Sequence, residues 1–287
     1  MAPFEQFLAS YERHEAGAEH DLVLLFNGVD GPAALTPYRE RTTRHGVTEI
    51  VLPARSLDLP AYLTAARELP HERLCFLNSY SEVLAPGWLH MLCEPLDRAG
   101  AGATAASGSW ASHRSFALSL LRLPNGYRGT LGDPRLMNSA LRSVSTQPKV
   151  SLPRRLVRAA IGLPGEIAGY GGFPAAHLRT NGFVIGRELL LSLRAGSLVS
   201  KNATYRFEAG HRSLTAQLRG RGLSTLVVAC DGSARAPDEW PDADVFWQGE
   251  QAQLLVADNQ TRQYADGDAL VREALARYAW GPRARPG

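Results

Sequence analysis

The stretch RLCFLNSYSE (residues 73–82) decides the fold, because its apolar run ends abruptly in a polar segment. RLCFL (73–77) has the length and composition of a buried strand, and NSYSE (78–82) is typical of the turn that follows one. Pro86-Gly87 marks a second turn, after which WLHMLCEPLDRAG (88–100) predicts a helix. Strand, turn and helix in this order form the repeating unit of an α/β protein.

The same alternation recurs on both sides of this unit. Apolar runs bounded by turn residues predict strands over 21–26, 47–52, 101–107, 183–185 and 223–232. Helical periodicity predicts helices over 38–45, 59–69, 187–193 and 205–221. Alternating strands and helices indicate a mostly parallel sheet flanked by helices, with right-handed crossovers.

Composition restricts the class of protein. The chain has 287 residues, 45% of them hydrophobic and 21% charged, which is typical of a globular protein. Its formal net charge of +3 does not indicate a dedicated nucleic-acid binder. Its three cysteines (Cys75, Cys93, Cys230) form no Cys-x-x-Cys pair, which favours a reducing compartment over a disulfide or zinc framework. With no signal peptide and no apolar run of about 18 residues, we expect a cytoplasmic protein.

The middle and the end of the chain depart from the regular pattern. Residues 122–176 are rich in Gly and Pro and predict an insertion of short, broken helices. We therefore expect one α/β domain over 1–232 and a C-terminal extension over 233–287 that packs on it. In the extension, Trp240, Phe246 and Trp247 are predicted to join the core, because aromatic side chains bury large areas. Residues 258–261 are predicted to form a turn or a helix cap.

Polar side chains follow several of the predicted strands. In an open parallel sheet, ligands bind outside the carboxyl ends of the strands. Asn27, Asp58 and Asn78 each follow a predicted strand, so we expect them at this edge. Asp58 is equally well explained as a helix cap, and Asn78 as a turn residue. Glu208, placed near the start of the predicted helix 205–221, is a fourth candidate.

Three segments together resemble the glycosyltransferases of the GT-A fold, family 2 in particular. They are CFLNSYSEVLAPGWLHML (75–92), RTNGFVIGRELLLSL (179–193) and TYRFEAGHRSLTAQLRGRGLSTLVV (204–228). The first is similar to the family's apolar strand, Asp-x-Asp motif and Gly-Trp-Leu helix. The third is similar to the acidic element that carries the family's catalytic base. The resemblance covers residues 20–230 and implies a GT-A-like sheet.

The resemblance implies an inverting, hexosyltransferase-like enzyme of polysaccharide biosynthesis. Such an enzyme moves a sugar from a nucleotide-sugar donor to a hydroxyl of a glycan or lipid-linked glycan. Glu208 occupies the position of the catalytic base. Asp58 is similar to the acid that reads the nucleotide base, and Asn78 and Tyr80 occupy the positions of the two aspartates. With Asn27 and Ser79, these residues would bind the nucleotide sugar.

Asn78 and Tyr80 are not anionic ligands at neutral pH, so no metal-ligating residue is predicted. The leaving diphosphate then needs protein cations, and Arg179 and Arg212 are the candidates, with Arg187 and Lys201 nearby. A divalent cation, Mg²⁺ or Mn²⁺, is the alternative source of this charge. Arg212 lies four residues after Glu208, a spacing that also suits a simple surface ion pair on one helix.

Two other functions fit parts of the sequence. Loss of both family aspartates also fits a catalytically inactive GT-A-like protein that binds a nucleotide, a glycan or a partner enzyme. A nucleotidyltransferase would need a basic, Gly-rich loop after the first strand, and NGVDGPAAL (27–35) contains no Lys or Arg. The basic stretch 149–158 is explained by a solvated face, or by peripheral contact with the inner face of an anionic membrane.

Overall fold

The computed structural model describes residues 1–52, 56–121, 123–127, 164–165, 167–198 and 200–287. The insertion predicted over 122–176 and the basic stretch 149–158 therefore lie largely or wholly outside the described residues. Within the described part of the chain, no helix has both the length and the apolar composition needed to cross a bilayer.

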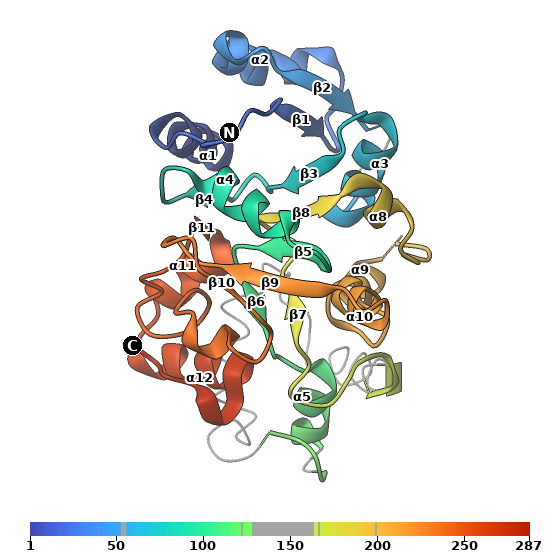
Figure 1. Ribbon diagram of the computed structural model, residues 1–287, viewed down its shortest axis with the longest axis vertical. Helices are drawn as coiled ribbons and strands as arrows, with labels where there is room; N and C mark the ends of the chain where they lie inside the picture. The colour runs from blue at the N-terminus through green and yellow to red at the C-terminus, as the bar shows by residue number, and fades with distance from the viewer. Residues whose placement is uncertain (53–55, 122, 128–163, 166, 199) are drawn as a thin grey trace.

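The described chain is a mixture of helices and short strands (Figure 1). The helices are α1 (Ala2–Arg13), α2 (Thr36–Thr42), α3 (Asp58–Glu68), α4 (Trp88–Cys93), α5 (His113–Leu120), α8 (Arg187–Leu191), α9 (Lys201–Ala209), α10 (Leu214–Gly220), α11 (Asn259–Ala265) and α12 (Ala269–Trp280). The strands are β1 (Val23–Phe26), β2 (Thr48–Val51), β3 (Arg73–Phe76), β4 (Glu82–Val83), β5 (Ala101–Ala105), β6 (Gly108–Ser109), β7 (His177–Leu178), β8 (Phe183–Gly186), β9 (Ser224–Val228), β10 (Ala234–Arg235) and β11 (Val256–Ala257). The predicted α/β class is confirmed.

The central sheet is mixed, so the expectation of a mostly parallel sheet was wrong. Its five strands lie in the order β10-β9-β5-β8-β3. β5 pairs with β9 in parallel, whereas β8 runs antiparallel to both β3 and β5. β6 follows β5 after two residues and pairs antiparallel with β7, the strand before β8, so the chain returns beside β5 in the opposite direction.

Side chains of alternate residues cover the two faces of this sheet. On one face, Phe183 and Ile185 of β8 join a large cluster that includes residues of α3, α8 and α10. On the other, Val184 packs in a second cluster with Leu89 and Leu92 of α4. Since successive strand residues point to opposite faces, this division follows directly from the apolar run FVI (183–185).

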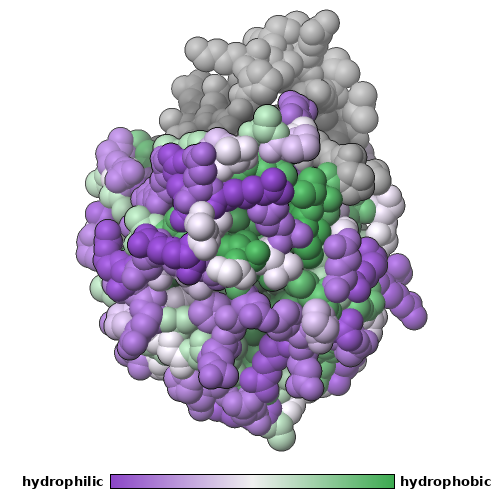
Figure 2. Space-filling model, turned by 90° about the horizontal axis from the view of Figure 1, so that it is seen from above, coloured by the Kyte–Doolittle hydropathy of each residue, from purple (hydrophilic) through white to green (hydrophobic). Residues whose placement is uncertain are grey.

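The N-terminal unit, which consists of α1, β1, α2 and β2, adjoins this sheet at one end of the molecule (Figure 1). β1 and β2 form a separate parallel pair, and Phe4, Phe7 and Leu8 of α1 pack in a cluster with Tyr38. The outward residue Val51 is 52% exposed. Figure 2, viewed from this end, shows patches of hydrophobic surface among hydrophilic residues. The N-terminal unit is therefore less completely covered than the central sheet.

One predicted helix is two helices in the structure. The helix expected over 205–221 is divided into α9 and α10 at Gly210. A Cβ atom at Gly210 would lie 2.5 Å from the carbonyl oxygen of Arg206 and 2.9 Å from that of Gly169. Only glycine lets these backbones approach so closely. The other predicted elements lie within a few residues of observed ones.

The C-terminal extension shares its core with the rest of the described chain. Trp240, Phe246 and Trp247 are at most 4% exposed and belong to the same cluster as Phe183, as predicted. The predicted cap is also present: Asp258 accepts hydrogen bonds from the backbone N–H groups of Gln260 and Thr261 at the start of α11.

A buried ion pair joins this extension to the segment before β8. The Arg179 guanidinium lies 2.5 Å from the Asp258 carboxylate, and both side chains are at least 91% buried. Arg179 also lies over the Phe246 ring, 4.3 Å from its centroid. The charge of Arg179 lowers the pKa of Asp258, against the effect of burial, which alone would raise this pKa.

We predict that Asp258→Asn lowers the free energy of unfolding by about 3–5 kcal/mol, because the Arg179 charge is left buried without its partner. Asp268→Asn is the matched control: Asp268 caps α12 in the same way but is exposed. Asn caps helices about as well as Asp, so the control should lose only a few tenths of a kcal/mol. Urea unfolding measures the free energy of unfolding of both variants. Equal losses in the two variants would contradict a special role for the buried ion pair.

Candidate functional site

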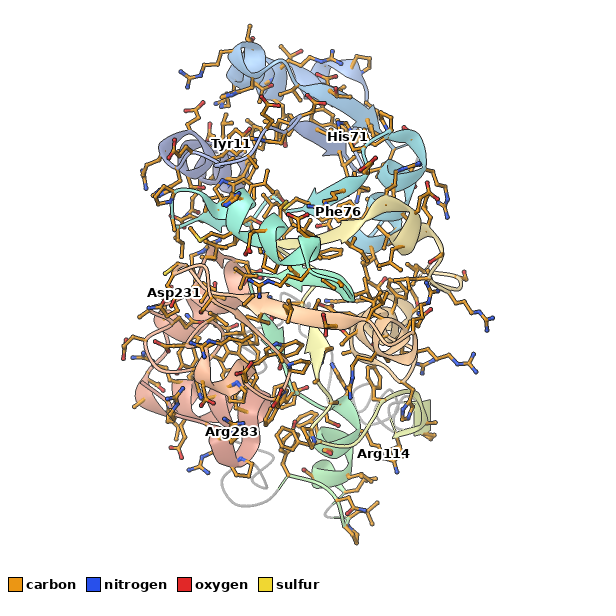
Figure 3. All side chains as sticks on the ribbon, viewed as in Figure 1. Tyr11, His71, Phe76, Arg114, Asp231 and Arg283 are labelled. Atoms are coloured by element: carbon orange, nitrogen blue, oxygen red, sulfur yellow. The ribbon has the colours of Figure 1, made fainter. Side chains whose placement is uncertain are left out.

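The candidate site lies where the carboxyl end of β3 meets the four residues that lead into β8. Figure 3 labels Phe76, the last residue of β3, whose carbonyl accepts a hydrogen bond from the Gly182 N–H at 2.8 Å. The Asn181 amide oxygen accepts from the backbone N–H of Asn78 at 2.9 Å and from the Ser81 hydroxyl at 2.7 Å. The strand end and the predicted turn 78–82 are therefore held by one short segment, 179–182.

Glu208 is bound by the same segment. Its carboxylate oxygen Oε1 accepts a hydrogen bond from the backbone N–H of Thr180 at 3.0 Å. Glu208 lies at the end of α9 and not near the start of a helix, because this helix begins at Lys201. Since Thr180 binds Glu208 and its neighbour Asn181 binds Asn78, two of the predicted site residues are brought together through adjacent residues.

Glu208 is half-buried, and the surrounding protein partly removes its carboxyl group from water. Burial raises its pKa, while the Thr180 N–H and the charge of Arg179 act in the opposite direction. Burial also raises the pKa of Asp58, with a further contribution from the negative charge of Glu208. The electrostatic contact places Asp58 and Glu208 in the same neighbourhood, although Asp58 as a whole residue remains exposed. Such desolvated carboxyl groups are candidates for acid–base chemistry.

A buried tyrosine completes this neighbourhood. Tyr62, one turn after Asp58 in α3, stacks on Phe76 with ring centroids 4.5 Å apart. Its hydroxyl group has no hydrogen-bond partner among the described residues. Burial raises its pKa, and the charges of Asp58 and Glu208 raise it further. An unpaired buried hydroxyl is uncommon in a folded protein, since its desolvation costs free energy.

The predicted nucleotide-binding residues have different surroundings. The Asn27 amide exchanges hydrogen bonds with the backbone of Ser56, at 2.6 and 2.7 Å, and so ties β1 to the segment before α3. The Asn78 amide oxygen accepts from the Tyr80 N–H at 2.9 Å, as expected for a turn. Ser79 and Tyr80 are exposed. Asp58 opens α3 without capping it.

The two predicted diphosphate-binding cations do not lie together. Arg179 is buried and paired with Asp258, so its guanidinium is already occupied. Arg212 is exposed and lies beyond Gly210, outside α9, so it does not share a helix face with Glu208. The proposed ion pair between Arg212 and Glu208 is absent from the interactions of the described residues.

Sequence reasoning missed Thr180, Asn181 and Ser81 as site residues. The only signal for them is the dipeptide Asn181-Gly182, which is typical of a turn directly before a strand. Gly182 adopts a positive φ of 65°. A Cβ atom there would lie 3.2 Å from the Ala106 side chain and 3.3 Å from that of Val256. The turn thus brings the segment close to β5 and β11.

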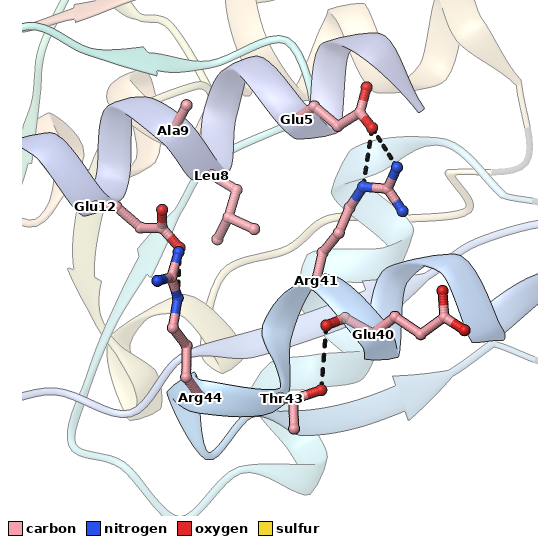
Figure 4. Close-up of a pocket in the computed structure, with 8 residues that line it drawn as sticks. All are labelled: Glu5, Leu8, Ala9, Glu12, Glu40, Arg41, Thr43 and Arg44. Carbon is pink, nitrogen blue, oxygen red and sulfur yellow. Dashed lines mark hydrogen bonds and ion pairs between the residues drawn. The ribbon is translucent and has the colours of Figure 1, made fainter.

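No group of three or more His, Cys, Asp or Glu side chains in the described chain is placed to share a metal ion. A cavity of about 520 Å³ lies between α1 and α2 (Figure 4), away from Glu208. Four of its charged side chains bind each other, in the pairs Arg41–Glu5 (2.5 Å) and Arg44–Glu12 (2.6 Å).

No protein-family model matches this sequence, and no curated protein matches it significantly.

The raised pKa of Glu208 predicts how stability changes with pH. The folded protein holds this proton more tightly than the unfolded chain, so its contribution to stability is complete below the ordinary glutamate pKa of about 4.3. It is lost as the pH rises through the folded-state pKa. Glu208→Gln removes the buried charge and keeps an oxygen for the Thr180 N–H.

We therefore expect Glu208→Gln to have a higher Tm than the wild type at pH 8, with the difference shrinking towards pH 4. Calorimetry across this range measures it. Glu188→Gln, on the exposed surface of α8, controls for the loss of one negative charge. A Tm difference that is independent of pH would show that the charge on Glu208 is not responsible.

Proposed function

We propose that this protein is an inverting glycosyltransferase of the GT-A type, with Glu208 as the general base. The donor is a nucleotide sugar, and the acceptor is a hydroxyl group of a glycan or lipid-linked glycan. The observation that carries the proposal is the pairing of Glu208 with Thr180 next to that of Asn78 with Asn181. It supports a shared site for the three segments on which the family resemblance rests.

The environment of Glu208 suits the removal of a proton from a weakly acidic hydroxyl. Carboxylates act as bases most effectively when their pKa approaches the working pH, and burial shifts Glu208 in that direction. Its Oε1 accepts from the Thr180 N–H, which holds the carboxylate in place, and in this proposal the acceptor hydroxyl approaches the same carboxylate. In the proposed step the proton passes to Glu208 as the acceptor oxygen forms its bond to the anomeric carbon.

The bond from the anomeric carbon to the diphosphate oxygen breaks in the same step, and the nucleoside diphosphate leaves with the electron pair. The sugar passes through an oxocarbenium-like state, as in glycoside hydrolysis. We propose that the turn 78–82 faces the donor and contacts it through its exposed residues Ser79 and Tyr80. The Arg179 guanidinium is already paired with Asp258, so in this proposal its positive charge stabilises the leaving diphosphate from a distance and does not contact it. A divalent cation carried by the donor phosphates is the alternative source of positive charge.

Asp58, an exposed residue, fits the donor side of the proposed site, and Tyr62 is buried one turn further along α3. The negative charge of Glu208 raises the pKa of both side chains, and both come from the first turns of α3.

The test measures nucleoside diphosphate released from a panel of nucleotide sugars, with and without EDTA. We expect release with one donor class, and a loss of about 10²–10⁴-fold in rate for Glu208→Gln with the nucleoside diphosphate affinity unchanged. Glu188→Gln is the control and should keep the wild-type rate, because Glu188 is exposed on α8.

Two results would overturn the enzymatic proposal. Wild-type activity in Glu208→Gln would remove the base from the mechanism. Tight nucleotide binding without turnover of any donor would instead favour the catalytically inactive binding protein, an alternative that the absence of both family aspartates also fits.

A further inference from the structure

The charges of the chain are unevenly distributed over residues 189–230, which include α9 and α10. Between Leu189 and Cys230 the sequence has six of the 31 Lys and Arg residues but only one of the 28 Asp and Glu residues, Glu208. The carboxylate of Glu208 is turned inward to Thr180. The surface of this region therefore carries positive charge with no acidic side chain of its own to balance it.

Hydrogen bonds hold three of these cationic residues close together. The Gln217 amide accepts from the Arg194 N–H at 2.7 Å and donates to the carbonyls of Arg194 at 3.2 Å and Arg212 at 2.8 Å. The Arg221 guanidinium binds the hydroxyl and carbonyl of Ser192, at 2.6 and 2.9 Å. Together with Arg219 of α10, the residues Arg194, Arg212 and Arg221 are called the arginine patch below.

The arginine patch is exposed and its charges are not paired. All four residues are exposed, and none forms an ion pair with a described residue. In Figure 3, side chains with nitrogen tips extend outward from the side of α9 and α10. The arginines of α2 differ: Arg39 lies 2.6 Å from Glu49, and Arg41 and Arg44 are paired with acids of α1. Of these two groups of arginines, only the arginine patch is thus free of acidic partners and able to bind an anion from solution or from a surface.

We propose that the arginine patch binds an anionic membrane surface. A fluid lipid surface can place several headgroups against unpaired arginines, and each basic residue near such a surface contributes favourably. None of the exposed large hydrophobic residues in the described chain lies between Leu189 and Cys230. Recognition is therefore electrostatic rather than by insertion. The same lack of exposed aromatic rings disfavours a single-stranded nucleic acid, whose bases stack on such rings.

This inference does not depend on the proposed enzymatic activity, but the arginine patch lies close to Glu208 in the chain. Arg212 lies four residues after Glu208, across the break at Gly210 that ends α9. Binding through the arginine patch would bring the Glu208 end of α9 near the lipid headgroups. If the enzymatic proposal also holds, the acceptor is lipid-linked.

Vesicle co-sedimentation of the full chain tests the inference. The probes are phosphatidylcholine vesicles with and without about one-third phosphatidylglycerol. We expect binding to the anionic vesicles alone, and its loss at about 1 M salt, where the screening length falls to about 3 Å. Arg194→Gln, Arg212→Gln and Arg219→Gln combined should weaken binding at least tenfold, since each charge is worth about fivefold.

The matched control combines Arg39→Gln, Arg41→Gln and Arg44→Gln, which removes the same charge from paired arginines. It should bind as the wild type does, and thermal unfolding checks that both triple variants are folded. Equal binding to neutral vesicles, or equal weakening by both triple variants, would overturn the inference. So would tighter binding to double-stranded DNA than to anionic vesicles. Donor turnover is measured without vesicles, so failure of the enzymatic proposal can be distinguished from failure of membrane binding.

Discussion

The buried ion pair between Arg179 and Asp258 is the interaction on which the candidate site depends. A charge pair this far from water costs desolvation energy, which its geometry and additional contacts must offset. Asp258 also caps α11, and Arg179 also packs on Phe246. The pair therefore attaches the C-terminal part of the chain to the residue immediately before Thr180.

Segment 179–182, held by this ion pair, connects the end of α9 with the turn that follows β3. Thr180 donates to the carboxylate at the end of α9, and Asn181 accepts from the backbone N–H that follows β3. The positive charge of Arg179 limits how far burial raises the pKa of Glu208. Removal of this charge would leave a carboxyl group that holds its proton more tightly and is a less available base at neutral pH.

Local patterns in the sequence predicted the elements but not their arrangement. The run VLLF ends at a turn and is a strand in the structure, and the polar residues from Asp258 to Thr261 form the predicted cap. The antiparallel course of β8 depends on the pairing of β7 with β6, which the apolar residues of β8 do not encode. The break at Gly210 depends on the approach of the Gly169 backbone, a contact that helical periodicity cannot reveal. The partner of Arg179 lies 79 residues away, and only the folded chain brings the two together.

The central claim, that segments 76–82 and 179–182 form one nucleotide-sugar site, is tested most directly by hydrogen–deuterium exchange of the full chain with and without nucleotide sugars. The account predicts that one donor class slows exchange in peptides covering both segments together. Protection confined to the cavity between α1 and α2, or no protection by any nucleotide sugar, would contradict it.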